Sequence, residues 1–130
     1  MNILVVDDDL ATLRVIGSML RTSGSAVDMA PSADMAIRMM EKTTYDVLFV
    51  DYNMPTHNGV WFIRNAAIPP QSRVILLSGS LDPVAVSDFR RLGIQSVIKK
   101  PFTMVSVLGC LKGIEDAASN IPGIAPQCAA

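Results

Sequence analysis

The chain has 130 residues, half of them apolar and 18% charged, and a formal net charge of −1 at pH 7. A chain of this size is expected to form one domain with a buried core. Its Lys and Arg residues are dispersed, which argues against a nucleic-acid-binding patch. The apolar runs are too short to span a bilayer, and no basic start precedes an apolar signal region. We therefore expect a soluble, cytoplasmic protein.

The first half of the sequence alternates predicted strands with predicted helices. Short apolar runs predict strands at residues 3–6, 26–30 and 46–50. Apolar residues recur from Leu10 at helical spacing, and Ser23-Gly24 is expected to end that helix. Ser32 offers the start of a second helix with an apolar face.

The second half continues this alternation. Two more strands are predicted at residues 73–77 and 95–99. Helices are expected to begin near Asn58-Gly59 and after two capping residues, Asp82 and Thr103. Pro83 strengthens the second of these starts because proline is favoured at the first helical position. The Pro69-Pro70 pair excludes a helix that runs through it.

Five βα units in series imply a parallel sheet with right-handed crossovers and helices on both faces. We therefore expect an α/β fold, a three-layer sandwich around a five-stranded parallel sheet, over residues 1–116. Residues 117–130 are mostly small, include two prolines and show no periodicity. We expect this segment to be a disordered tail.

Polar side chains stand where four of the predicted strands end. The run Asp7-Asp8-Asp9 follows the first strand, and Asp51 follows the third. Ser78 follows the fourth strand, and Lys100 lies at the end of the fifth. Parallel strands bring their carboxyl ends to one edge, where open α/β sheets bind their ligands. We therefore expect these side chains to share one crevice.

The acidic residues favour a metal site. Two carboxylates about 4 Å apart repel by roughly 4 kcal/mol at an effective dielectric constant near 20. A cluster of Asp7, Asp8 and Asp51 therefore calls for a cation. Oxygen ligands without a nearby His or Cys favour a hard ion such as Mg²⁺. Taken alone, the acids also allow a structural interpretation, in which Asp8 or Asp9 caps the first helix and Asp51 begins a turn.

Ser78 and Lys100 add the other groups that phosphoryl transfer uses. This chemistry needs a metal, fixed donors and positive charge near the phosphoryl oxygens, and an in-line nucleophile. An aspartate carboxylate is such a nucleophile and forms an aspartyl phosphate. The sequence has no Gly-rich phosphate loop, which excludes a P-loop nucleotide site.

Four segments, in this order and at this spacing, resemble the receiver domain of two-component response regulators. They are Leu4–Asp9, Asp51–Pro55 followed by Gly59, Leu77–Gly79, and Lys100–Thr103. The resemblance covers about residues 1–116. It implies a CheY-like, flavodoxin-like sheet with the strand order 2-1-3-4-5.

The resemblance also implies roles for the acidic edge of the sheet. Asp51 corresponds to the phosphoacceptor, which attacks a phosphoryl group carried on a histidine of a sensor kinase. Asp8 corresponds to the direct Mg²⁺ ligand, and Asp7 to a ligand that acts largely through water. Asn53 corresponds to the position whose backbone carbonyl completes the metal shell.

Two further positions correspond to groups that contact the phosphoryl group. Ser78 corresponds to the switch hydroxyl, and Lys100 to the lysine that contacts the same group. Strand alternation sends the neighbouring Lys99 to the other face. A cis peptide is expected before Pro101. Gly79 fits a position at which a small residue leaves the phosphoryl group open to water.

One position departs from the family pattern. Three residues before Lys100 the family usually carries Tyr or Phe, whereas this chain has Val97. An aliphatic side chain has no polar tip, so we predict a weaker or differently built switch. Tyr52 is a candidate to flank the site entrance, and His57 is expected to be solvated.

The implied function is a Mg²⁺-dependent phosphorylation switch rather than an enzyme. Its upstream partner would be a histidine kinase or a histidine phosphotransfer protein, and a protein target would bind the fourth helix, fifth strand and fifth helix. We expect no direct nucleic-acid or membrane partner. One alternative is a haloacid-dehalogenase-like phosphatase, although Asn53 stands where that class needs a second carboxylate. Another is a receiver segment of a hybrid kinase or longer regulator.

Overall fold

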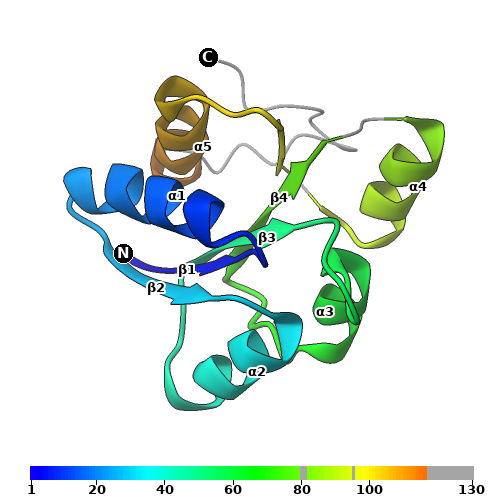
Figure 1. The fold of residues 1–130 in the computed structure, drawn as a ribbon. Helices are drawn as coiled ribbons and strands as arrows, with labels where there is room; N and C mark the ends of the chain where they lie inside the picture. The colour runs from blue at the N-terminus through cyan, green and yellow to red at the C-terminus, as the bar shows by residue number, and fades with distance from the viewer. Residues whose placement is uncertain (80–81, 95, 117–130) are drawn as a thin grey trace.

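A computed structural model describes residues 1–79, 82–94 and 96–116, in which strands and helices alternate (Figure 1). The strands are β1 (Asn2–Val6), β2 (Ala26–Ala30), β3 (Val47–Asp51), β4 (Arg73–Ser78) and β5 (Ser96–Lys99). The helices are α1 (Leu10–Thr22), α2 (Ala33–Lys42), α3 (Gly59–Asn65), α4 (Pro83–Arg91) and α5 (Met104–Asp116). The predicted tail at 117–130 lies outside the described residues.

The strands form one parallel sheet in the order β2-β1-β3-β4-β5. β3 is the central strand, with Val50 opposite Val6 on one side and Leu76 on the other. The first crossover runs from β1 outward to β2, and the second returns past β1 to β3. The predicted fold class and strand order are therefore confirmed.

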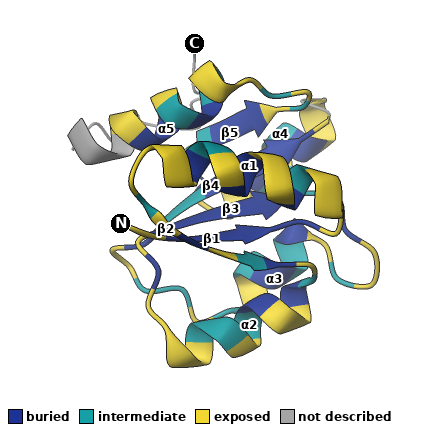
Figure 2. Cartoon of the chain, turned by 60° about the vertical axis from the view of Figure 1, so that its left-hand side comes forward, coloured by how far each residue is buried: buried dark blue, intermediate teal, exposed yellow. Residues whose placement is uncertain are grey.

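The sheet separates two buried clusters, and alternate residues of each strand point to opposite sides. Leu48 and Val50 of β3 pack beneath α2, α3 and α4, whereas Val47 and Phe49 pack beneath α1 and α5. Figure 2 shows the central strand β3 buried, its neighbours mostly buried, and the helices exposed along their outer faces. The helices thus form the two outer layers of the predicted sandwich.

Each helix begins at a side chain that accepts a hydrogen bond from a backbone N–H of the first turn. The carboxylate of Asp9 accepts from the N–H of Ala11, and the hydroxyl of Thr103 accepts from that of Ser106. The remaining helices are capped in the same way, by Ser32, Asn58 and Asp82. These caps satisfy donors that the helix itself leaves unpaired, which explains why the helix starts could be predicted from the sequence.

Two strands extend one residue beyond the prediction at the polar edge, and at the opposite edge β1 begins one residue earlier than predicted, at Asn2. β3 includes Asp51 because this residue lies opposite Leu77 in the ladder, and it omits Asp46, whose carboxylate accepts from the N–H of Asn2. β4 extends to Ser78, which lies opposite Lys99. Both extensions carry strand geometry into the polar edge. Among the described residues, no helix has the length and apolar character needed to cross a membrane.

Candidate phosphoryl-transfer site

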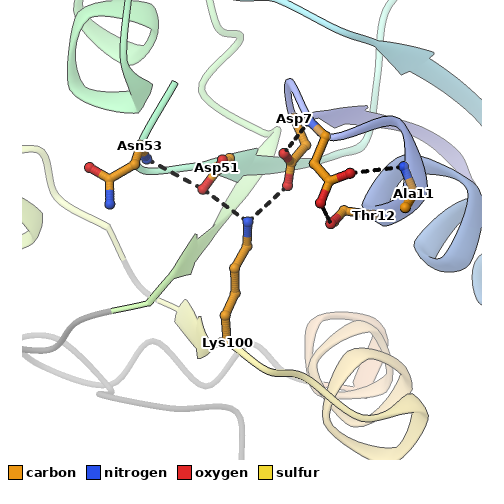
Figure 3. A network of polar contacts seen from close by, with 7 residues as sticks. Asp7, Ala11, Thr12, Asp51, Asn53 and Lys100 are labelled. Carbon is orange, nitrogen blue, oxygen red and sulfur yellow. Dashed lines mark hydrogen bonds and ion pairs between the residues drawn. The ribbon is translucent and has the colours of Figure 1, made fainter. Parts of the chain in front are cut away.

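Asp7, Asp51 and Lys100 meet at the carboxyl edge of the sheet (Figure 3). Lys100 Nζ lies 3.0 Å from Asp7 Oδ2 and 3.3 Å from Asp51 Oδ1. Both carboxylates are buried, whereas the lysine side chain keeps 27% of its surface exposed. One ammonium group therefore bridges two acids that come from adjacent strands.

The three consecutive aspartates have different surroundings. The first, Asp7, is fully buried and accepts a hydrogen bond from the backbone N–H of Asp9 at 2.9 Å. Asp9 caps α1 and also accepts from the Thr12 hydroxyl. Asp8 is exposed and has a carboxylate oxygen within 4.8 Å of oxygens of both Asp7 and Asp51. The structural interpretation thus holds for Asp9, while Asp8 belongs to the acidic cluster.

The charges at this edge are only partly compensated. Burial, followed by the charge of Asp7, raises the pKa of Asp51 to about 6, although Lys100 acts in the opposite direction. Burial alone would lower the pKa of Lys100, but its hydrogen bond to Asp7 and the two nearby carboxylates raise it above its ordinary value. The site therefore holds a reliably protonated lysine beside an aspartate whose ionisation is costly.

The donor set fits a hard divalent cation. The three clustered side chains of Asp7, Asp8 and Asp51 offer carboxylate oxygens only, and hard cations bind oxygen ligands. One of the three is exposed, which leaves an approach from solvent. A single lysine compensates the acids, so a further positive charge would stabilise the ionised form of Asp51.

The chain after β3 turns sharply around Asp51. The backbone N–H of Asn53 donates to Asp51 Oδ1 at 3.3 Å, while its amide side chain points away from Lys100 (Figure 3). The N–H of Gly59 donates to the carbonyl of Tyr52. A Cβ atom on Gly59 would lie 2.6 Å from the Asp51 carbonyl oxygen, so only glycine fits here. The start of α3 is thereby held against the backbone of the site.

Ser78 and Lys100 reach the site from β4 and the end of β5. Ser78 is fully buried and follows Leu77, the residue opposite Asp51. The backbone N–H of Lys100 donates to the Ser78 carbonyl at 2.7 Å, which joins these two segments. The Lys100–Pro101 peptide is cis, as predicted. Lys99 is exposed and has no ion pair among the described residues, in keeping with its expected orientation.

Two contacts near the site did not follow from the sequence patterns. The Tyr52 hydroxyl donates to Asp88 Oδ2 on α4 at 2.8 Å, and the Tyr52 ring meets Phe89 edge-on. His57 is only partly solvated, because its ring stacks on Trp61 with the centroids 3.6 Å apart. An aromatic residue directly after a strand-end aspartate is a signal for the first contact, but its partner lies 36 positions along the chain.

Val97 is fully buried in β5, and it belongs to the same apolar cluster as Phe89. Tyr52 packs against this cluster from the side of the β3–α3 loop. The aromatic side chain next to α4 therefore comes from the segment after β3 rather than from β5.

The sequence model of the response regulator receiver domain matches residues 3–112. The probable chemotaxis protein CheY of Rhizobium etli is 22% identical over 116 residues, which cover 86% of this chain and 90% of that protein. Chemotaxis protein CheY-3 of Vibrio cholerae is 25% identical and is covered to 85% of its length. The sensory/regulatory protein RpfC of Xanthomonas campestris is 27% identical, but this chain spans only 16% of it.

Solved structures show the same fold. The chemotaxis protein CheY4 of Vibrio cholerae aligns with a TM-score of 0.81 at 23% identity, over 87% of this chain and 97% of that one. A CheY-like receiver domain protein from Methanospirillum hungatei aligns with a TM-score of 0.82 at 23% identity, over 88% and 94% of the two chains. With the family match over most of its length, the chain belongs to the receiver domains of two-component response regulators.

Proposed function

We propose that Asp51 accepts a phosphoryl group from a phosphohistidine and that this changes a protein-binding surface. The observation that carries the proposal is the pair of ion contacts from Lys100 to Asp7 and Asp51 at the end of the central strands. A carboxylate oxygen of Asp51 attacks phosphorus and forms a P–O bond. The P–N bond to the donor histidine breaks, and its electron pair leaves with the imidazole nitrogen.

The pKa of Asp51 suits this role at neutral pH. With a pKa of about 6, most of this group is ionised at pH 7 and is therefore competent as a nucleophile. Its ionised form is stabilised less by its surroundings than that of an exposed aspartate, which makes the carboxylate a more basic nucleophile. Lys100, which contacts the acceptor oxygen in the free protein, supplies positive charge where the phosphoryl oxygens arrive.

Asp7, Asp8 and Asp51 are the side chains that would hold Mg²⁺, together with the Asn53 backbone carbonyl that the family resemblance implies. When bound, the metal supplies charge neutralisation for the phosphoryl oxygens. Asp7 orients Lys100 through its 3.0 Å contact and holds the loop that carries Asp8 through the Asp9 N–H. The chain's own contribution is thus a prearranged set of oxygens and one ammonium group.

Ser78 is the residue proposed to form a hydrogen bond with the phosphoryl group once Asp51 is phosphorylated. The added group on Asp51 brings acceptor oxygens and about 1.5 to 2 negative charges. A hydroxyl at the end of β4, one residue beyond the partner of Asp51, can donate to one of these oxygens. A side chain on the neighbouring Gly79 would meet nothing within 4 Å, so this side of the site is open to water that could hydrolyse the acyl phosphate.

The partners follow from this chemistry. The donor is a histidine kinase or a histidine phosphotransfer protein, and the target binds a surface of α4, β5 and α5 whose arrangement changes with phosphorylation. The kinase, the target and a cytoplasmic location are part of the proposal, as is a domain that ends near residue 116. RpfC, of which this chain matches a small part, is a relative in which a receiver domain forms part of a longer protein.

The test is phosphorylation by a small donor, read by intact mass. The protein is incubated with Mg²⁺ and acetyl phosphate, alongside Asp51→Asn and the matched variant Asp46→Asn at the other end of β3. We expect one phosphoryl adduct in the wild type and in Asp46→Asn, no adduct in Asp51→Asn, and none when EDTA removes the metal. Rapid, repeated hydrolysis of phosphomonoesters would instead identify a haloacid-dehalogenase-like phosphatase. A wild type that takes up no phosphoryl group would contradict the proposal.

A further inference from the structure

Tyr52 connects the phosphoacceptor strand to α4 through two separate groups. Its backbone N–H donates to the Leu77 carbonyl of β4 at 2.8 Å, and its hydroxyl donates to Asp88 on α4 at 2.8 Å. The ring lies edge-on to Phe89 with the centroids 5.2 Å apart. One residue, adjacent to Asp51 in the sequence, therefore contacts both the strand that ends at Ser78 and the helix that follows it.

The partners of the Tyr52–Asp88 hydrogen bond are fixed in position and in donor and acceptor role. Asp88 also pairs with Arg91 one turn later, which fixes the carboxylate that receives the Tyr52 hydroxyl. Burial, followed by the hydrogen bond to Asp88, raises the pKa of Tyr52 to about 12, so the phenol remains a donor at neutral pH. The contact therefore depends on the position of α4, which carries Asp88.

Phosphorylation acts on the segment that leads into this helix. Ser78 ends β4 and Pro83 begins α4, so the two are separated by four residues. If Ser78 moves toward a phosphoryl group on Asp51, the start of α4 is drawn with it, whereas Tyr52 holds the middle of the helix to the end of β3. Val97 of β5 lies in the same buried cluster as Phe89 of α4, but its aliphatic side chain has no hydroxyl that could bond to this helix.

We infer that the Tyr52–Asp88 hydrogen bond is a latch that holds α4 in its unphosphorylated position. This inference rests on the proposed function of Asp51. Because the bond favours the unphosphorylated arrangement, its removal raises the fraction of molecules in the arrangement that accommodates a phosphoryl group, and phosphorylation becomes faster in proportion to that fraction. Tyr52 thus acts as a positioning residue for α4. It takes this role from the segment after β3, whereas the family usually carries an aromatic residue in β5.

The decisive variant is Tyr52→Phe, which removes the hydroxyl and keeps the ring on Phe89. The chain offers a matched control in Tyr45→Phe, because the Tyr45 hydroxyl donates at 2.7 Å to Asp28 of β2, the edge strand opposite β5. Both variants lose one tyrosine–carboxylate hydrogen bond of nearly the same length. Two readouts are used: the rate of phosphorylation by acetyl phosphate with Mg²⁺, and backbone amide exchange in α4 of the unphosphorylated protein.

For Tyr52→Phe we expect phosphorylation to be about two- to tenfold faster and α4 amides to exchange faster by a similar factor, the range that one net hydrogen bond supplies. Tyr45→Phe should change neither quantity. In an Asp88→Ala background the Tyr52→Phe effect should disappear, because the two side chains act as one unit.

Three outcomes would overturn the latch. They are an unchanged phosphorylation rate in Tyr52→Phe, the same change in Tyr45→Phe, and an undiminished Tyr52→Phe effect in the Asp88→Ala background. A wild type that forms no adduct overturns the proposed function, and the latch with it. An adduct in the wild type with no difference between the two tyrosine variants overturns the latch alone.

Discussion

At the amino end of β3, the Tyr45 hydroxyl donates to Asp28, the Ser72 hydroxyl donates to the Tyr45 carbonyl, and the N–H of Asn2 donates to Asp46. At the carboxyl end, Asp7 and Asp51 share one lysine, and the exposed Asp8 stands beside them. Each carboxylate of the first end has its own donor. The second end has more negative charge than the described contacts neutralise, and a metal ion can neutralise this excess.

Among the side chains that contact Asp51, Lys100 should have the largest effect on phosphorylation when it is replaced. Lys100→Met keeps much of the side chain's length but removes the charge that contacts Asp51 at 3.3 Å. We expect phosphorylation by acetyl phosphate to slow on the order of 100-fold, the effect of removing one preorganised charged donor. Intact-mass time courses with saturating Mg²⁺ measure this rate.

Lys99→Met is the control for the loss of a positive charge on the same segment, because Lys99 is exposed and forms no ion pair with the described acidic residues. The phosphorylation rate of this variant should stay within about twofold of the wild type, because an exposed charge that makes no direct contact is screened by solvent and salt. Equal slowing in both variants would mean that the net charge of the segment, rather than the contact made by Lys100, assists transfer.

Asp51→Asn should stabilise the free protein. The folded-state pKa of Asp51 is about 6, against a value near 4 in an unfolded chain. Because the folded protein holds the proton more tightly, ionisation weakens folding as pH rises between these values, and the whole penalty is present above about pH 6. A pKa difference of about two corresponds to roughly 3 kcal/mol. At pH 7.5 without metal we therefore expect Asp51→Asn to gain about 2 to 3 kcal/mol in unfolding free energy, as measured by urea denaturation.

The pH and metal dependence of this gain separates its causes. The difference between Asp51→Asn and the wild type should shrink below pH 6 and vanish below about pH 4, where Asp51 is protonated in both states. Added Mg²⁺ should also reduce the difference, because metal binding to the folded wild type stabilises it. A gain that is constant from pH 4 to pH 8 would show that packing, not charge, is responsible.

Gly59 tests the close approach of α3 to the site. In Gly59→Ala the new Cβ would lie 2.6 Å from the Asp51 carbonyl oxygen. The backbone has to shift, and we expect a loss of about 2 kcal/mol in unfolding free energy, typical of overpacking, with slower phosphorylation. Gly113→Ala in α5 meets nothing within 4 Å and should instead stabilise by about 0.5 to 1 kcal/mol. Destabilisation by both variants would argue against a steric cause at Gly59.

The sequence predicted the parts of the fold that depend on local chemistry. Short apolar runs located the strands, and side chains such as Ser32 and Asp82 located helix starts, because a cap acts within three residues of itself. The meeting of Asp7, Asp51 and Lys100 could also be anticipated, since parallel strands end at one edge. The extension of β3 to Asp51 could not, because it depends on the register with β4.

The parts that escaped prediction depend on how the helices rest on the sheet. The bond from Tyr52 to Asp88 requires the position of α4, which no local pattern specifies. The stacking of His57 on Trp61 likewise depends on the course of the loop before α3. Among the three adjacent aspartates, the sequence left open which caps α1, and only the path of the chain after β1 assigns that role to Asp9.

The smallest effect is expected for a substitution at the amino end of β3, Tyr45→Phe. This substitution removes a hydroxyl that donates to Asp28, and burial followed by this hydrogen bond raises the pKa of the Tyr45 phenol to about 12. We expect a loss of about 1 kcal/mol in unfolding free energy, the net worth of one such bond. Phosphorylation and its Mg²⁺ dependence should remain unchanged, because this end contributes no group to the acidic cluster. A clear change in phosphorylation rate would mean that the two ends of β3 are coupled through the strand, and the contrast between a structural and a functional end would fail.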